Sequence, residues 1–213
     1  MFKDRCQAGI QLAEKLRDLD RCRNCIVFAI PRGGVVVAAE VAEHLNLPLD
    51  LIVTKKIGAP FNPELAIGSV DPAGRVNVDQ TTAARLNISP TYWQTAAKET
   101  GALIRRQLEQ YRRSVDYPNL EQTTAIIVDD GIATGQTVIA AIGFLRSLSA
   151  QRIIVATPVI APSTLSKLNE LADEVRYVLC EEHFFAVGQF YQDFSPVNDN
   201  EVMTIMAGRN NQL

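Results

Sequence analysis

Five short runs of β-branched and apolar residues alternate with helical stretches, and this alternation limits the fold more than any other feature of the chain. Each run ends in a turn, and three of the five turns are followed by a segment with helical spacing. This order predicts parallel strands with helices packed on the faces of the sheet. The runs are almost continuously apolar, as expected for strands buried on both faces. The predicted strands are residues 25–30, 49–54, 124–128, 152–158 and 174–180.

Helices are predicted before and between these strands, over residues 5–19, 35–45, 136–148 and 162–171. In the first of them, apolar residues lie near one stripe, which favours packing against the sheet. These residues are Ile10, Leu12, Ala13 and Leu16. The fold class expected is therefore α/β, with a mostly parallel central sheet flanked by helices.

Residues 56–120 form a long, mostly irregular insertion in this pattern. A DPAG tetrad at residues 71–74 predicts a turn between two short extended pieces. A long helix is expected from Ser89, as N-cap, with Pro90 at its first position. Its core-facing residues would be Trp93, Ala97, Ile104, Leu108 and Tyr111. Beside the carboxyl edge of a doubly wound sheet, such an insertion is either a lid over a ligand crevice or an oligomer contact.

Composition narrows the functional classes. The 213 residues carry 21 basic and 24 acidic side chains without a basic run, so no nucleic-acid partner is expected. No apolar stretch reaches the roughly 18–20 residues of a membrane span, and the first residues lack a signal-peptide core, so a cytoplasmic protein without a membrane partner is expected. The four cysteines are then expected to be reduced. Cys22 and Cys25 lack nearby partners for a four-ligand zinc site, although a metal or redox role stays open.

The most specific segment is residues 125–137, where a buried strand leads through a small-residue loop into a helix. Asp129 and Asp130 end the strand, and their mutual repulsion calls for a cation, hydroxyl donors or solvent. The helix amino terminus offers free N–H groups to a phosphate, and Gly135 allows a close backbone approach. Thr134 and Thr137 add hydroxyl donors. A plain strand end with solvated carboxylates is the alternative interpretation.

A second loop of this kind follows the first strand. Arg32, Gly33 and Gly34 stand between that strand and the next helix. Two glycines permit unusual backbone angles, and the guanidinium of Arg32 suits diphosphate oxygens. Lys55 and Lys56, just past the second strand, would add positive charge at the same sheet edge.

These two segments resemble the signatures of type I phosphoribosyltransferases, and the whole layout is most similar to stand-alone predicted phosphoribosyltransferases of undefined acceptor. The resemblance implies that Asp129 and Asp130 hold the ribose hydroxyls of 5-phosphoribosyl 1-diphosphate (PRPP). It also implies that residues 133–137 bind its 5′-phosphate and that the loop containing Arg32 binds its diphosphate.

The end of the chain resembles the carboxyl-terminal hood of purine-salvage enzymes, here residues 181–213. By this resemblance Phe185 stacks on a base, Val187 contacts the base edge, and Asp193 lies near the metal. A core aromatic cluster is the alternative. The 6-oxopurine enzymes have an Asp where this chain has Ala133, so no general base is apparent.

The resemblance thus implies Mg²⁺-dependent transfer of a phosphoribosyl group from PRPP to a nitrogenous, nucleobase-like acceptor, with Arg32, Asp129 and Asp130 as catalytic residues and Asp193 as a metal candidate. A PRPP- or nucleotide-sensing regulator, a phosphohydrolase and a scaffold protein are the rival interpretations. Base rates suggest a homodimer. The implied substrate-binding residues are Arg32, Gly33, Gly34, Lys55, Asp129, Asp130, Ala133, Thr134, Gly135, Gln136, Thr137, Phe185 and Val187.

Overall fold

The core of the protein is a five-stranded, wholly parallel sheet. The computed structural model describes residues 1–112 and 114–208, without the side chains of residues 63 and 64. The strands follow the order β2 (Leu49–Leu51), β1 (Cys25–Ala29), β6 (Thr124–Val128), β7 (Arg152–Ile160) and β8 (Glu174–Cys180). All four strand pairs are parallel, which confirms the predicted fold class.

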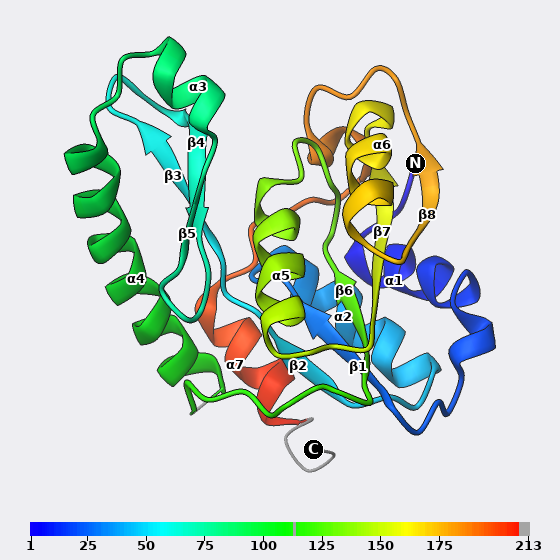
Figure 1. Ribbon diagram of the computed structural model, residues 1–213. Coiled ribbons are helices and arrows are strands. Elements are labelled where there is room, and N and C mark those ends of the chain that lie inside the picture. Colours follow the sequence, from blue (N-terminus) through cyan, green and yellow to red (C-terminus); the bar gives the residue numbers. More distant parts are fainter. Residues whose placement is uncertain (113, 209–213) are drawn as a thin grey trace.

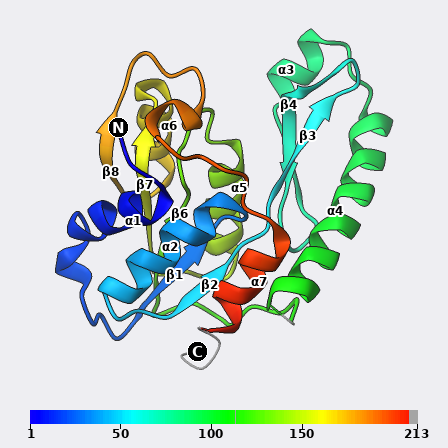
Figure 2. The ribbon, with the colours of Figure 1, turned by 180° about the vertical axis from the view of Figure 1, so that it is seen from behind.

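Helices cover both faces of this sheet (Figures 1 and 2). On one face lie α1 (Arg5–Glu14) and α2 (Gly33–His44), and on the other lie α5 (Gln136–Ser147) and α6 (Pro162–Leu171). Alternate strand residues enter the two cores: Ile126 packs on the α1 and α2 side, and Ile127 on the α5 and α6 side. Both residues are fully buried, which is why the strands read as continuous apolar runs.

The strand order places a topological switch point between β1 and β6. From β1 the chain continues to β2 at the edge, whereas β6 leads on to β7 in the opposite direction. In open α/β sheets, ligands bind in the crevice outside the carboxyl ends of strands at such a point. The loops at residues 30–34 and 129–135 both leave the sheet there.

The insertion is more regular than its glycine and proline content predicted. It forms an antiparallel sheet of β3 (Lys55–Ala59), β4 (Asn62–Val70) and β5 (Val76–Val78), followed by α3 (Gln80–Arg85) and α4 (Pro90–Arg112). The second predicted strand was too long, because parallel pairing ends at Leu51 and Lys55 already pairs with Val70 in the other sheet.

The predicted turn and long helix are confirmed. At the turn, the Asp71 carboxylate accepts hydrogen bonds from the backbone N–H groups of Ala73 and Arg75, and Gly74 has φ +78°. Helix α4 starts at Pro90, and Ser89 Oγ accepts a hydrogen bond from a backbone N–H of its first turn. The expected stripe of α4 is buried at Ala97, Ile104, Leu108 and Tyr111 and partly buried at Trp93.

Three other expectations are corrected or limited. Ile10 is 41% exposed, because the buried face of α1 consists of Arg5, Ala8, Gly9, Leu12 and Ala13. The first helix is also shorter than predicted, since it ends at Glu14 and a 3-10 turn, η1 (Arg17–Leu19), follows. Cys22 and Cys25 form a disulfide across a Cα–Cα distance of 5.4 Å, instead of staying reduced. The carboxyl-terminal segment contains the 3-10 helix η2 (Val187–Phe190) and α7 (Asp199–Ala207), but residues 209–213 of the expected hood lie outside the described residues.

None of the helices in the described part of the chain combines the length and apolar character that a bilayer crossing requires.

Candidate functional site

Two adjacent carboxylates stand at the carboxyl end of β6. Asp129 accepts a hydrogen bond from the backbone N–H of Asp130 at 2.9 Å, which turns the first carboxylate back over the loop. Burial, and then the neighbouring charge of Asp130, raise the pKa of Asp129 well above its usual range. Burial also raises the pKa of Asp130, and a bond from Arg5 opposes that rise. The pair therefore favours a bound cation or hydroxyl donors.

Arg5, at the first residue of α1, is the cationic partner of this pair. Its Nε lies 2.7 Å from Asp130 Oδ2, and only 10% of its side chain is exposed. The same guanidinium donates to the Ser195 carbonyl at 2.8 Å and stacks 3.8 Å over the ring of Phe194. Tyr191 Oη donates to the Asp130 carbonyl at 2.5 Å. These partners of Asp130 could not be predicted from the sequence, because they lie 61 or more positions from it along the chain.

The β1–α2 loop touches the acid pair through its two glycines. A Cβ on Gly33 would lie 1.9 Å from Asp130 Oδ2. A Cβ on Gly34 would lie 3.0 Å from Asp129 Cα and from its Oδ1. Only glycine allows this approach at Gly33, so the sequence GG at the start of α2 is what brings the two predicted phosphate loops together. The peptide bond between Pro31 and Arg32 in this loop is cis.

The loop after the acids forms a cradle at the amino terminus of α5. Gly135 is the N-cap with φ +74°, a left-handed conformation that favours glycine, and it offers no side chain to cap the first turn. The Thr164 hydroxyl of α6 donates to the carbonyl of Ala133, and Thr54 Oγ1 donates to the Thr137 carbonyl at 3.0 Å. These bonds fix the loop from both sides. An anion is stabilised at such a helix end.

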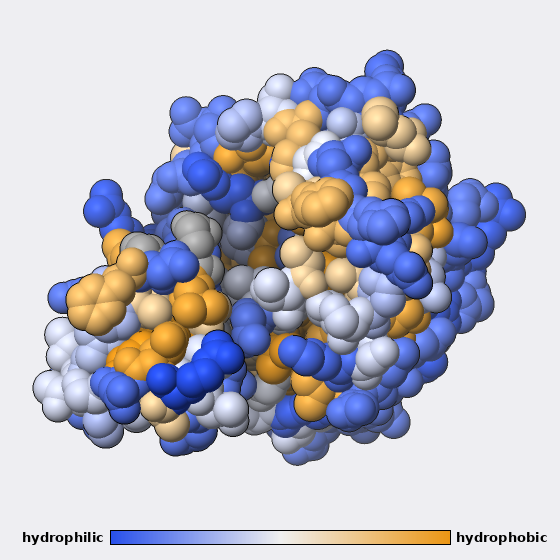
Figure 3. Space-filling model, turned by 90° about the horizontal axis from the view of Figure 1, so that it is seen from above, coloured by the Kyte–Doolittle hydropathy of each residue, from blue (hydrophilic) through white to orange (hydrophobic). Residues whose placement is uncertain are grey.

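A cleft of about 560 Å³ opens over this cradle, between the insertion and the core. Seen from above, the surface is hollowed between these two parts (Figure 3). The cradle contributes Ala133, Thr134, Gln136 and Thr137 to the cleft, and Lys56 and Lys167 add cationic side chains from β3 and α6. The volume suits a phosphorylated small molecule.

Arg32 and Lys55 lie close together beside the same loops, as predicted, although Lys55 belongs to β3. Burial, and then the charge of Arg32, lower the pKa of Lys55, and Asp199 opposes this effect. Arg32 Nη1 lies 3.5 Å from Asp199 Oδ1, and Tyr111 Oη donates to that oxygen at 2.7 Å. The Arg32–Asp199 pair is about half exposed, so the guanidinium is free to exchange this partner for an anionic ligand.

The three site residues predicted in the hood differ in how they lie relative to the acid loop. Val187 lies against the acid loop, since a Cβ on Gly131 would lie 2.4 Å from Val187 Cγ1. The side chain of Phe185 is 89% exposed. The Asp193 carboxylate accepts bonds from the backbone N–H and hydroxyl of Ser195, at 2.9 and 2.6 Å.

Comparison with known proteins identifies the family of the sequence. The sequence matches the family described as "Phosphoribosyl transferase domain" over residues 2–195. It is 36% identical over 206 residues to two Mycobacterium tuberculosis proteins, "Putative phosphoribosyl transferase MT0597" of strain CDC 1551 / Oshkosh and "Putative phosphoribosyl transferase Rv0571c" of strain ATCC 25618 / H37Rv. Each alignment covers 97% of this chain but 46% of the relative, so the chain spans about half the length of these curated relatives. Among solved structures it is similar to TT1426 from Thermus thermophilus, with 36% identity, a TM-score of 0.81 and 98% coverage of both chains.

Proposed function

Since this chain belongs to the phosphoribosyl transferase domain family, we propose that it transfers the phosphoribosyl group of PRPP to a nitrogenous acceptor and releases pyrophosphate. The observation that carries this proposal is the contact between two loops at neighbouring strand ends. Gly33 of the first loop lies against Asp130 of the second, which brings a basic loop, a carboxylate pair and a helix amino terminus together at one switch point.

Each part of this arrangement suits one part of PRPP. The cradle at residues 133–137 would bind the 5′-phosphate through the start of α5. Asp129 and Asp130 would accept hydrogen bonds from the ribose hydroxyls, which relieves the repulsion between the two carboxylates. Arg32 and Lys55 would bind the diphosphate, with Arg32 leaving Asp199 to do so.

In the proposed reaction the bond between C1′ and the diphosphate oxygen breaks, and a bond forms between C1′ and the acceptor nitrogen. The leaving diphosphate takes the bonding electron pair, and the acceptor nitrogen releases its proton. Arg32 stabilises the charge on the leaving group, while the carboxylate pair stabilises the positive charge that develops on the ribose.

Magnesium fits this site as a companion of the substrate. Among the described residues no group of three or more His, Cys, Asp or Glu could hold a metal ion alone. Mg²⁺ commonly binds one or two carboxylates together with substrate phosphates, and Asp129 and Asp130 supply such a pair. When bound, the ion would neutralise charge on the diphosphate. Asp193 stays a further candidate in the hood.

The insertion and the hood are proposed to enclose the acceptor. Lys56, Leu65 and Ala66 of the insertion already line the cleft opposite the cradle. Closure over PRPP would keep water away from C1′ and prevent hydrolysis. Val187, beside Gly131, is the proposed contact for the edge of a nucleobase-like acceptor, and the exposed Phe185 the proposed stacking residue.

Calorimetric titration of PRPP, with and without Mg²⁺, tests the binding half of the proposal. Saturable binding that Mg²⁺ strengthens is expected, and the variant with Asn at both Asp129 and Asp130 should lose it. Asp116→Asn is the matched control, since this carboxylate lies near the far end of α5. Equal PRPP affinity of the double variant and the control would refute the site.

Pyrophosphate release in the presence of PRPP and a panel of nitrogenous bases tests the transfer half. Base-dependent release supports a transferase. Tight PRPP binding without base-dependent release would favour the rival role of a PRPP-sensing regulator, and release of phosphate without an acceptor would favour a phosphohydrolase.

A further inference from the structure

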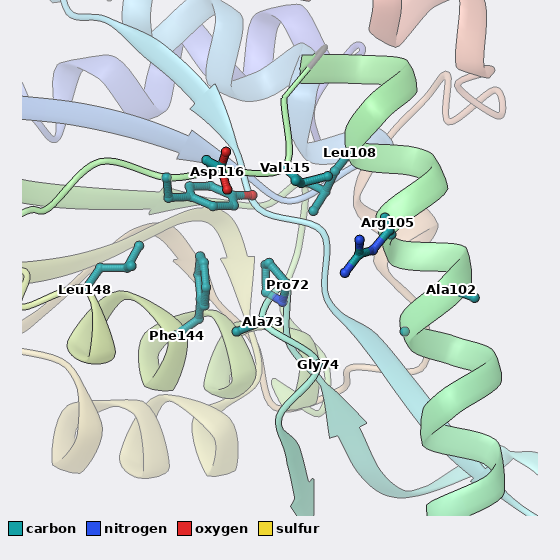
Figure 4. A pocket seen from close by; sticks show the side chains of 12 residues that line it. Pro72, Ala73, Gly74, Ala102, Arg105, Leu108, Val115, Asp116, Phe144 and Leu148 are labelled. Carbon is teal, nitrogen blue, oxygen red and sulfur yellow. The ribbon is translucent and has the colours of Figure 1, made fainter.

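A second cavity, of about 540 Å³, lies at the opposite end of α5 from the cradle (Figure 4). Its walls come from α4, the β4–β5 turn, the segment at residues 115–117 and the last turns of α5. Leu148 on its wall lies 12 residues beyond the start of α5, which at 1.5 Å per residue is about 18 Å from the cradle. The two cavities share no lining residue.

Aromatic and aliphatic groups form most of this second cavity. The rings of Tyr117 and Phe144 meet edge to face with centroids 4.8 Å apart. Tyr117 Oη donates to the Leu51 carbonyl at 2.9 Å, so the hydroxyl is satisfied and the ring serves as wall. Pro72 and Leu108 continue the apolar surface from the turn and from α4. Such walls suit a flat apolar molecule.

One cationic group, the exposed side chain of Arg105, extends toward this cavity, whose other charged lining residue is Asp116. In Figure 4 the side chain of Arg105 extends from α4 toward Pro72. Within the part of the chain that the structure describes, Arg105 makes no ion pair or hydrogen bond. The neighbouring arginines differ, because Arg75 pairs with Asp71 at 2.7 Å and Arg112 with Asp50 at 2.6 Å. Arg105 is thus available to a ligand anion.

A glycine in the middle of α4 widens the cavity. Gly101 lies one turn before Arg105 on the cavity wall, and no atom lies within 4 Å of the place where its Cβ would be. Glycine is a poor helix former, and no close contact requires it at this position. The missing side chain leaves room that any larger residue would fill.

We propose that this cavity is a binding site for a small planar, largely apolar molecule that carries one anionic group. The ring system would lie against Phe144 and Tyr117, and the anion would pair with Arg105. The volume falls within the roughly 300–1,000 Å³ of small-molecule sites. The proposal does not depend on the proposed transferase function, because the site shares no residue with the PRPP cleft.

Fluorescence titration with anilinonaphthalene sulfonate tests the site, since this probe carries a planar naphthalene ring, is largely apolar and is singly anionic. The neutral probe N-phenylnaphthylamine lacks only the sulfonate and reports the apolar part alone. Three variants separate the contributions: Gly101→Leu fills the cavity, Arg105→Gln removes the cation, and Gly143→Leu is the matched control. Gly143 is also a helical glycine with nothing within 4 Å of its Cβ position, but it does not line this cavity.

The unmodified protein should bind one sulfonate probe per chain, and millimolar pyrophosphate should not displace it. Gly101→Leu should weaken the binding of both probes by about tenfold or more, and Gly143→Leu should leave the affinity for both unchanged. Arg105→Gln should weaken the sulfonate probe by about tenfold, the size of a lost charge-assisted hydrogen bond, and leave the neutral probe unaffected. If Gly101→Leu does not fold, as a thermal melt would show, Arg105→Gln decides the proposal with the two probes. Unchanged binding of the sulfonate probe in folded Gly101→Leu or in Arg105→Gln would overturn the proposal, as would displacement of that probe by pyrophosphate.

Discussion

Replacing Gly33 with alanine should damage the candidate site more than the fold. Gly33 begins α2 and does not have a positive φ, so alanine suits its backbone conformation. The added methyl group would meet the acid loop, with Asp130 Oδ2 at 1.9 Å, Asp130 Cγ at 2.7 Å and Arg5 Nε at 2.9 Å. The substitution is therefore a test of contact between the two loops, free of backbone strain.

The size of the effect follows from these distances. Non-bonded carbon contacts are stable at about 3.5–4.0 Å, so the Asp130 carboxylate must move by more than about 1 Å. That movement disturbs its 2.7 Å contact with Arg5, where both side chains are at most 14% exposed. Overpacking of this kind costs about 1–3 kcal/mol. If the overpacking is relieved by displacing the residues that bind PRPP, the same free energy weakens PRPP binding by about 5- to 150-fold.

Calorimetric titration of PRPP measures the binding loss, and urea unfolding measures the free energy of unfolding. Gly143→Ala is the matched control, because this helical glycine has open space at its Cβ position. It should raise the free energy of unfolding by about 0.5–1 kcal/mol and leave PRPP affinity unchanged.

Two results would refute the reasoning at different points. If the free energy of unfolding and the PRPP affinity of Gly33→Ala both equal those of the unmodified protein, the β1–α2 loop does not lie against Asp130 in solution. If stability falls but PRPP affinity does not, the loops touch but the acid pair is not where PRPP binds.

Three further substitutions test electrostatics and hydrogen bonds, two of them at the site and the third at Arg112, which packs on Tyr117 beside the second cavity. Asp129→Asn should raise the free energy of unfolding at pH 8 by on the order of 1 kcal/mol, because the raised pKa of Asp129 means that its ionisation destabilises the folded state. In urea unfolding at different pH values, this gain in stability should shrink toward pH 4, where the carboxyl is protonated in the folded state and increasingly so in the unfolded state. Tyr191→Phe should cost about 1–2 kcal/mol and lower the melting temperature by about 2–8 °C, since the Asp130 carbonyl loses its donor, and an unchanged melt would argue against that bond. Arg112→Met should cost about 3–5 kcal/mol in urea unfolding by leaving Asp50 buried without its partner, and adding Asp50→Asn should recover part of that loss.

The strands could be predicted where apolar character and sheet pairing coincide. The runs at residues 124–128 and 174–180 match β6 and β8 at both ends. Ile52 and Val53 caused the error at the second strand, because they are at most 2% exposed although the pairing has already ended. A buried residue is apolar whether it pairs within a strand or lies beyond the end of the pairing, so the sequence pattern is the same. The insertion was harder still, since the register between β3 and β4 shifts around Gly58 and hides the alternation of a regular strand.

The site shows the same division between local and long-range signals. The acid pair, the cradle and the Gly33 loop are each encoded within a few residues, so their residue types and order pointed to phosphate and sugar binding. Asp199 and Arg5 carry no such local signal. Asp199 reaches Arg32 only because α7 packs against α2 and α4 (Figure 2), and its sequence shows no more than an acidic first turn of a helix.

The placement of Arg5 has a physical consequence for how the site is held together. Phe2 pairs with the hood in both directions, donating to the Phe190 carbonyl at 2.7 Å and accepting from the Gln192 N–H at 2.8 Å. Three residues later, Arg5 bonds both Asp130 and the Ser195 carbonyl. The first residues of the chain therefore hold the hood and the acid pair at once, and neither attachment can shift without disturbing the other. Since burial would otherwise disfavour the ionised form of Asp130, Arg5 also favours the charged form of that carboxylate, so the contact that anchors the hood also supports the charge that we propose to bind the ribose.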